Sequence, residues 1–263
     1  MKSDRMTFVS DVEGWDNIAE QYSEWLDGGV GAKGMAFTNI VTSNVSAILG
    51  DVGGKEILDL GCGEGYFSRY LVERGAKVSA IDGAPNMIRI AKCKGPNSRI
   101  DFMVGDITQT LPYDSNKFDV VLCNMVLMDL EDVTKTFSEV ARILKLGSKF
   151  VFSVVHPCYF DALGEWIDIG SAHPALRFKH RYIEQVRCMK KLVGLPSGVD
   201  LNHYNRPIQD YIKPLIANRL CISDFIETSF SREFLEELGL FQELMIYHLT
   251  ANNLIIGATR IAS

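Results

Sequence analysis

Short apolar runs recur through the first 155 residues, and stretches with a helical pattern separate them. The runs are rich in Val, Ile, Leu and Phe: Glu56–Leu60, Lys77–Ile81, Ile100–Val104, Phe118–Cys123 and Lys149–Val155. Near-continuous apolar runs of this length are typical of parallel strands that are buried on both faces. The alternation of strands and helices predicts an α/β fold with a doubly wound, mostly parallel sheet.

Glycines mark the ends of the helices between these strands. The predicted helices Tyr66–Arg74, Pro85–Lys94 and Val133–Leu146 are each followed directly by a glycine. Glycine is the common residue just past a helix because it adopts the left-handed conformation that ends it. Before the first strand, Trp15–Trp25 has its apolar side chains at helical spacing, which predicts an amphipathic helix that packs on the domain or closes over a ligand.

The pattern changes after Val155. Residues 156–206 are irregular and rich in aromatic and charged residues. The alternation then resumes with a helix, a strand, a helix and a last strand: Asp210–Asn218, Leu220–Glu227, Arg232–His248 and Asn253–Arg260. We place Pro214 near the first turn of the first of these helices, where a missing N–H costs least. The result is seven strands with an insertion after the fifth.

Composition narrows the classes of partner. The 263 residues are 47% hydrophobic and carry a formal net charge of -6, which disfavours nucleic acid and anionic membranes. The six cysteines form no C-x-x-C pair, and neither a metal-ligand cluster nor a disulfide framework is expected. Residues 1–10 have no apolar signal core, and no apolar run reaches the ~20 residues of a membrane helix. We expect a reduced, cytoplasmic protein.

The first strand leads directly into a glycine-rich turn. Its sequence is Ile57-Leu58-Asp59-Leu60-Gly61-Cys62-Gly63-Glu64-Gly65. In a doubly wound fold the ligand lies beyond the carboxyl ends of the strands, at this turn. Glycine allows a tight turn and a close approach of the backbone to a ligand, and the next helix offers free N–H groups. The dinucleotide fingerprint G-x-G-x-x-G would need glycine at Tyr66, which disfavours a dinucleotide oxidoreductase.

Acidic residues close the next two strands. Asp82 ends the second strand, close to the ~20 residues after Gly61 that are expected of a ribose partner, and Asp106-Ile107 follows the third strand. The glycine spacing, with Asp59 before it and these acids after it, resembles motif I and the following motifs of the class I S-adenosylmethionine-dependent methyltransferases. The likeness is to the small-molecule branch of that family.

The resemblance implies S-adenosylmethionine as the cofactor. In the family, the residue matching Asp106 accepts a hydrogen bond from the adenine amino group, and the backbone at Ile107 reads the ring. The end of the fourth strand, Asn124-Met125, faces the methionine part, and the segment around Tyr22 covers the cofactor. The resemblance implies these cofactor-binding residues: Tyr22, Asp59, Gly61, Gly63, Gly65, Asp82, Gly83, Met87, Asp106, Ile107, Asn124 and Met125. Leu144–Ser148 departs from the family's Leu-Lys-Pro-Gly-Gly turn at two positions, which leaves the chemistry untouched.

The same resemblance divides the chain into four parts. Residues 1–50 form an N-terminal helical cover, and residues 51–155 form the cofactor-binding half of the Rossmann-like domain. Residues 156–206 are a substrate lid inserted after strand five. Residues 207–263 complete the domain and end in an antiparallel strand. We therefore expect an enzyme that transfers a methyl group to an O, N or C atom of a small molecule.

In-line methyl transfer needs a general base only if the acceptor must lose a proton. His156 directly follows the fifth strand, at the edge of the sheet where the substrate is expected, and is our candidate base. The lid supplies the candidate substrate-binding residues Tyr159, Trp166, Arg177, Arg181 and Tyr204. The basic run Arg177–Lys191 suits an anionic substrate, although the sequence favours a solvated lid surface or a dimer contact as its explanation.

Two other classes share parts of this pattern. A nucleic-acid methyltransferase shares the glycine turn, but the amino-directed DNA enzymes carry Asn/Asp-Pro-Pro-Tyr where this chain has Asn124-Met125-Val126-Leu127. A catalytically silent cofactor-binding or scaffold protein would keep the same cofactor residues. The sequence leaves the oligomeric state open.

Overall fold

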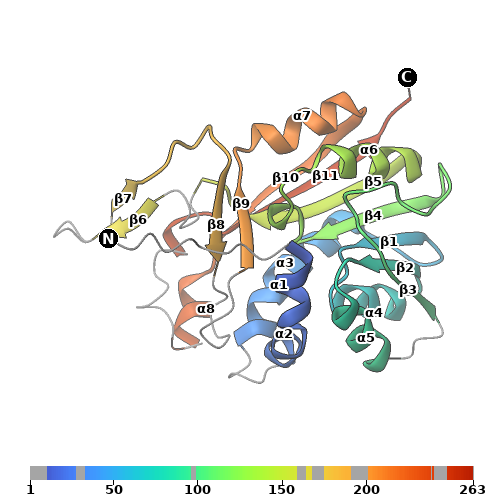
Figure 1. Cartoon of the computed structure of the whole chain (residues 1–263), viewed down its shortest axis with the longest axis horizontal. Coiled ribbons are helices and arrows are strands. Elements are labelled where there is room, and N and C mark those ends of the chain that lie inside the picture. The colour runs from blue at the N-terminus through green and yellow to red at the C-terminus, as the bar shows by residue number, and fades with distance from the viewer. Residues whose placement is uncertain are drawn as a thin grey trace.

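Seven strands form one mixed sheet in the computed structural model, which describes residues 11–27, 33–95, 99–158, 164–167, 175–190, 201–237, 239 and 248–262 (Figure 1). The strands are β1 (Glu56–Leu60), β2 (Lys77–Asp82), β3 (Ile100–Val104), β4 (Phe118–Asn124), β5 (Leu144–Val155), β10 (Leu220–Thr228) and β11 (Asn253–Arg260). Their order is β10-β11-β5-β4-β1-β2-β3. The strands β1 to β5 pair in parallel, whereas β11 is antiparallel to both β5 and β10. The predicted fold class, including the antiparallel last strand, is confirmed.

Helices cover both faces of this sheet. On one face lie α3 (Lys33–Leu49), α4 (Tyr66–Glu73) and α5 (Pro85–Cys93), and on the other lie α6 (Thr134–Ile143) and α7 (Gln209–Ala217), as Figure 1 shows. Each face has its own apolar cluster. The apolar side chains of the β-strands therefore meet helices on both sides, as near-continuous apolar strands require.

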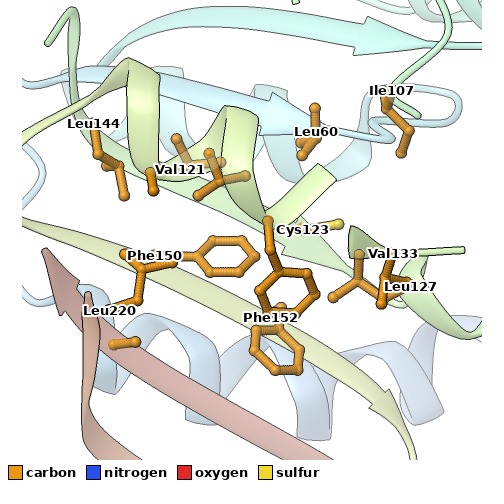
Figure 2. Packing of buried hydrophobic residues seen from close by; sticks show 14 of the residues in the cluster. Leu60, Ile107, Val121, Cys123, Leu127, Val133, Leu144, Phe150, Phe152 and Leu220 are labelled. Atoms are coloured by element: carbon orange, nitrogen blue, oxygen red, sulfur yellow. The ribbon is translucent and has the colours of Figure 1, made fainter. Parts of the chain in front are cut away.

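Phenylalanines fill the core beneath α6. Phe137 of α6 packs edge-to-face on Phe150 and Phe152 of β5, with ring centroids 5.6 and 5.7 Å apart. All three side chains are fully buried, and Figure 2 shows Phe150 and Phe152 in this cluster beside Leu127 and Val133. Aromatic pairs in this geometry add to the stabilisation from their buried area. The cluster fixes β4, β5 and the segment after β4, which supply one wall of the site described below.

The α6 helix also carries a buried carboxylate. Glu139 accepts hydrogen bonds from Arg142, at 2.7 Å, and from the backbone N–H of Leu111, at 2.9 Å. These donors, Arg142 first, lower the pKa of Glu139 to about 2. Since the pKa in the folded state lies below the ordinary value, the carboxylate stabilises the fold above that ordinary value, and this contribution disappears as the pH falls towards 2.

We therefore expect Glu139→Gln to lower the free energy of unfolding at pH 7 by on the order of 2–3 kcal/mol, because it removes the charge that Arg142 pairs with. The difference between the wild type and the variant should shrink as the pH falls below 4. Urea unfolding at pH 7 and at pH 3 measures both values. A difference that stays constant over this range would show that Glu139 acts through its shape and not its charge.

The N-terminal segment forms two helices where the sequence predicts one. The helix α1 (Asp11–Asn17) ends before Ile18, and α2 (Ala19–Leu26) begins after it. The break has a tertiary cause: Asp16 at the end of α1 accepts a hydrogen bond from the backbone N–H of Asn86 at 2.6 Å, in the first turn of α5. Ile18 itself is buried. The prediction of a continuous helix over Trp15–Trp25 is therefore wrong, although its apolar face does pack on the domain.

The insertion contains two β-hairpins that the sequence does not reveal. One pairs β6 (Gly164–Ile167) with β7 (Ala175–Phe178), and the other pairs β8 (Val186–Lys190) with β9 (Leu201–Asn205), both antiparallel. In Figure 1 both pairs lie at one end of the sheet, β8 and β9 beside the N-terminal helices and β6 and β7 further out. The β9 strand is buried along its length and packs against α1 and the 3-10 helix η2 (Leu127–Asp129). The expectation of irregular structure is wrong for this part.

Two helix boundaries and the place of Pro214 also differ from the predictions. The helix α6 ends at Ile143, because Leu144 already extends into β5. Pro214 lies beyond the first turn of α7, not within it. The helix α8 (Arg232–Glu237) is followed by a turn at Gly239 with a φ of 66°, so the predicted helix Arg232–His248 is interrupted there, although His248 is helical again. None of the helices in the described part of the chain has the length and apolar character needed to span a bilayer.

Candidate cofactor and acceptor site

A cavity of about 520 Å³ runs along the carboxyl ends of the parallel strands. This volume lies within the range of small-molecule sites. Following the order of the strands in the sheet, the residues that line it from each strand end are Asp106, Asp82, Gly61, Asn124, Val155 and Asn253. One cavity therefore passes from β3 at one side of the sheet to β11 at the other.

The glycine turn after β1 forms the floor of this cavity. Gly61 has a φ of 77°, and a Cβ atom there would lie 2.6 Å from Cγ2 of Val126. Gly65 has a φ of 81°, and its Cβ would lie 3.0 Å from Phe102. Gly61 and Gly63 line the cavity, whereas Gly65 is absent from the lining and allows α4 to pack closely on the sheet. The turn thus needs glycine both for its backbone angles and for its close contacts.

Asp82 ties this turn to the end of β2. Its Oδ2 accepts a hydrogen bond from the backbone N–H of Gly63, and its Oδ1 accepts one from that of Ala84, both at 2.8 Å. Burial raises the pKa of Asp82, while these two donors oppose the shift. The carboxylate is therefore fixed in the cavity wall, next to the glycines.

Asp59 is a buried carboxylate beneath the same turn. It is 1% exposed, and its Oδ2 accepts a hydrogen bond from the Ser68 hydroxyl at 2.6 Å. Burial raises the pKa of Asp59 to about 7. The hydrogen bond from Ser68 thus joins Asp59 of β1 to α4, and Asp59 also lines the cavity.

The third strand ends in a turn that Asp106 closes. Its Oδ1 accepts hydrogen bonds from the backbone N–H of Thr108, at 2.8 Å, and from the Thr108 hydroxyl, at 2.6 Å. Ile107 is buried, whereas the Asp106 side chain is exposed, and both line the cavity. The carboxylate keeps unused acceptor sites, since each of its oxygens has two lone pairs.

Aromatic side chains of the N-terminal helices cover this part of the cavity. Tyr22 lies 5.3 Å from Trp15 in an edge-to-face arrangement and 5.8 Å from Trp25 in a stacked one, measured between ring centroids. Trp15 and Tyr22 pack against a cluster that contains Ala84 and Met87. Burial raises the pKa of Tyr22, which keeps the phenol neutral. Trp15 and Trp25 line the cavity together with Tyr22, the residue that the sequence placed in the cover.

The structure brings the predicted cofactor residues together. Apart from Gly65, every one of them lines the same cavity: Tyr22, Asp59, Gly61, Gly63, Asp82, Gly83, Met87, Asp106, Ile107, Asn124 and Met125. They come from α2, α5 and the ends of four neighbouring strands. The cavity thus combines carboxylate acceptors, glycine backbone that a ligand can approach closely, and aromatic side chains that cover it. This combination suits an adenosyl group that is bound to a short polar chain.

The opposite end of the cavity holds a residue that the sequence analysis did not single out as functional. We call this region the acceptor end; its lining residues are Met128, Asp129, Leu130, Val155, Phe230 and Asn253. Asp129 is 4% exposed, and its Oδ1 lies 3.8 Å from Nδ1 of His203. In the sequence Asp129 belongs to a run of acidic residues before α6, with Glu131 and Asp132. Acidic residues before a helix usually accept hydrogen bonds from the N–H groups of its first turn, and Asp132 accepts one from Thr134 at 2.8 Å.

His156 lies outside the lining of this cavity. It is 2% exposed; its Nδ1 accepts a hydrogen bond from the backbone N–H of Cys158 at 3.2 Å, and its Nε2 lies 2.6 Å from Oε1 of Glu227. Since Nδ1 accepts, Nε2 carries the proton and donates it to Glu227. Burial lowers the pKa of His156. The expectation that this histidine serves as the base is therefore not supported. One ring nitrogen contacts Glu227 of β10, and the other contacts the first residues of the insertion.

The basic lid residues are also away from the cavity. Arg177 pairs with Glu165, and Arg181 pairs with Glu184 at 2.7 Å. Both arginines are exposed, and neither lines the cavity. This geometry is that of a solvated lid surface, the alternative that the sequence left open.

The remaining lid candidates divide differently. Tyr204 is buried and donates a hydrogen bond to Oδ1 of Asp11 at 3.1 Å, so it lies behind the cavity wall that Asp11 forms. Trp166 is in β6, but its side chain lies outside the described residues, as does Tyr159 entirely. The lid therefore supports the cavity through β9, by a contact that sequence position alone does not indicate.

Comparison with known proteins assigns this arrangement to a family. A family described as "Methyltransferase domain" matches residues 58–152. An S-adenosylmethionine-dependent methyltransferase from Mesorhizobium loti is 28% identical, with a TM-score of 0.68 over 83% of this chain and 96% of that one. This comparison extends the likeness well beyond the matched domain.

Two curated relatives are similar over shorter stretches. A ubiquinone biosynthesis O-methyltransferase from Xanthomonas oryzae pv. oryzae is 30% identical over 54% of this chain and 60% of the relative. A malonyl-[acyl-carrier protein] O-methyltransferase from Serratia marcescens is 32% identical over 46% of this chain and 47% of the relative. The chain thus spans about half to three fifths of the length of these relatives. Together with the strand order and the glycine turn, the matches show that residues 58–152 form a methyltransferase domain and that the chain is similar to class I S-adenosylmethionine-dependent methyltransferases.

Proposed function

We propose that the protein transfers a methyl group from S-adenosylmethionine to a small molecule that binds at the acceptor end. The observation that carries this proposal is the continuity of the cavity from Asp82 and Asp106 to Asp129 and Asn253. A methyl donor and an acceptor can then lie end to end, which in-line displacement requires. The two curated relatives are named as O-methyltransferases, and this favours an oxygen acceptor over nitrogen or carbon.

In this proposal the cofactor lies across the ends of β3, β2, β1 and β4. Asp82 accepts hydrogen bonds from the ribose hydroxyls, and Asp106 and Ile107 bind adenine. The glycine turn and Asn124-Met125 hold the methionine part, while Trp15 and Tyr22 cover the nucleoside. When bound, S-adenosylmethionine supplies an electrophilic methyl group on a sulfonium. The protein's own contribution is to position the reactants and exclude water, because a well-aligned pair reacts with a large effective molarity.

The charge of the substrate is a separate matter. Arg177 and Arg181, which motivated an anionic substrate, pair with lid acids and do not line the cavity. Our proposal therefore does not depend on an anionic substrate.

Calorimetric titration tests the cofactor half of the proposal. We expect the cofactor product, S-adenosylhomocysteine, to bind the purified protein at one site, and NAD to bind at least ~100-fold more weakly, because the third glycine of the dinucleotide turn is absent at Tyr66. Comparable affinities for both compounds would contradict the proposal.

Asp106 should set the preference for adenine. We expect Asp106→Ala to weaken S-adenosylhomocysteine by about 10- to 100-fold, the value of one hydrogen bond to a charged group, and to change the affinity for the inosyl analogue little. Thr108→Val is the matched control, because it removes the hydroxyl that donates to Asp106 but leaves the carboxylate. An equal loss for both analogues would mean that Asp106 supports the turn and does not read the base.

A further inference from the structure

The acceptor end is apolar apart from two side chains. Met128, Leu130, Val155 and Phe230 supply the apolar surface, and Asp129 and Asn253 supply the polar groups. Asp129 is the charged residue among these six, and Asp11, which also lines the cavity, accepts hydrogen bonds from Asn202 and Tyr204 of β9. A pocket of this kind binds an apolar body and orients it through a few polar contacts.

The position of Asp129 is fixed by buried groups behind it. The Arg206 guanidinium, 1% exposed, donates hydrogen bonds to the backbone carbonyls of Leu127, Leu130 and Glu131, on either side of Asp129. His203 of β9, also 1% exposed, approaches the carboxylate itself at 3.8 Å. Arg206, directly after β9, thus holds the backbone around η2, and His203 of β9 lies beside the Asp129 carboxylate.

A carboxylate in this place is costly. Removing a charge from water carries a penalty of several kcal/mol, and an apolar residue would fill the same wall without it. At the start of α6 it is Asp132 whose carboxylate accepts a hydrogen bond from the backbone N–H of Thr134. Asp129 lines the cavity beside the ends of β4 and β5, where the methyl acceptor is expected.

Resting on methyl transfer as the proposed function, we propose that Asp129 accepts a hydrogen bond from the nucleophilic O–H or N–H group of the acceptor. The acceptor is then an apolar molecule with a hydroxyl or amino group, not a carboxylate or phosphate. In the reaction a lone pair of this oxygen or nitrogen forms the bond to the methyl carbon. The carbon–sulfur bond breaks with its electron pair going to sulfur, and the acceptor's proton passes to the Asp129 carboxylate and from there to solvent.

Charge selectivity gives this assignment a test that needs no knowledge of the natural substrate. Three probes share one apolar body and differ in their polar group: 4-propylphenol, 4-propylbenzylamine and 4-propylbenzoate. Their affinities are measured by ligand-observed NMR at pH 7.5 on protein saturated with S-adenosylhomocysteine. We expect the phenol and the amine to bind at least ~10-fold more tightly than the benzoate, because like charges placed side by side are strongly unfavourable. Asp129→Asn should reduce this preference to within about 3-fold, because the amide carries no charge to repel the benzoate.

Asp132→Asn is the matched control. It makes the same change three residues further along, at an exposed position, and asparagine still caps a helix well. The control should keep the wild-type preference. A benzoate that binds as tightly as the phenol, a preference that survives in Asp129→Asn, or no binding of any probe would overturn the inference. Titration with S-adenosylhomocysteine alone separates the two claims: if it binds the wild type while the probes show no preference, only the role of Asp129 fails.

Discussion

Replacing Asp82 by alanine is expected to weaken the binding of S-adenosylhomocysteine by about 10²- to 10⁴-fold. The carboxylate is held at the end of β2 by the N–H groups of Gly63 and Ala84, at 2.8 Å each, and faces the cavity. Two hydrogen bonds from a ribose to a charged acceptor are each worth about 1.5–3 kcal/mol, and 1.4 kcal/mol corresponds to a factor of ten. Isothermal titration calorimetry measures the loss.

Two further variants test whether the loss comes from the charge of Asp82 and from its place in the cavity. Asp82→Asn keeps an acceptor oxygen without the charge, and its affinity should lie between those of the wild type and Asp82→Ala. Asp101→Ala removes an exposed carboxylate of β3 that does not line this cavity, and it should bind like the wild type. An Asp82→Ala protein that is folded and binds with unchanged affinity would remove Asp82 from the cofactor site.

Gly61→Ala is expected to lower the free energy of unfolding by about 2–5 kcal/mol. Its φ of 77° costs an alanine roughly 1–2 kcal/mol, and overpacking adds about 1–3 kcal/mol. The overpacking arises because the new Cβ would lie 2.6 Å from Cγ2 of Val126, a β-branched side chain with little freedom to move. Urea unfolding without cofactor measures the change.

Gly63→Ala separates the two costs. Gly63 also has a positive φ, 53°, but a Cβ there meets nothing within 4 Å, so this variant should lose only the conformational part. Adding Val126→Ala to Gly61→Ala should recover part of the stability by removing the clash. If Gly61→Ala and Gly63→Ala are equally stable, the close approach of β1 to the segment after β4 has no energetic consequence.

The sequence predicts the sheet well because its strands are defined locally. The runs Glu56–Leu60, Ile100–Val104 and Asn253–Arg260 match β1, β3 and β11 at both ends. Strands buried on both faces need apolar side chains at nearly every position, so their limits are visible in the residue pattern. The cofactor residues follow for a related reason: they lie at the carboxyl ends of these strands, and the topology brings such ends together.

The features that the sequence does not reveal depend on contacts between distant segments. The break at Ile18 follows from the hydrogen bond between Asp16 and α5, and the lid strand β9 packs against α1 and η2. Asp129 is indistinguishable from Glu131 and Asp132 in the residue pattern, since only its burial at the cavity wall separates it from them. Local patterns carry no information on such packing.

The residues expected in the lid site illustrate the same limit. His156 does follow β5 at the predicted edge of the sheet, but its ring is directed to Glu227 and the backbone of Cys158. Arg177 and Arg181 lie in the predicted insertion, but on its exposed surface. A position along the chain identifies the edge of the sheet that a residue reaches and not the direction of its side chain.

Transfer of a labelled methyl group tests the central claim most directly. The wild type and Asp82→Ala are incubated at equal concentration with methyl-labelled S-adenosylmethionine and a small-molecule extract from which protein and nucleic acid have been removed. We predict that the wild type moves the label into a small organic product, and that Asp82→Ala forms the product at least ~100-fold more slowly at low cofactor concentration. A wild-type protein that binds the cofactor but transfers no label to any small molecule would contradict the account and leave a cofactor-binding protein without methyltransferase activity.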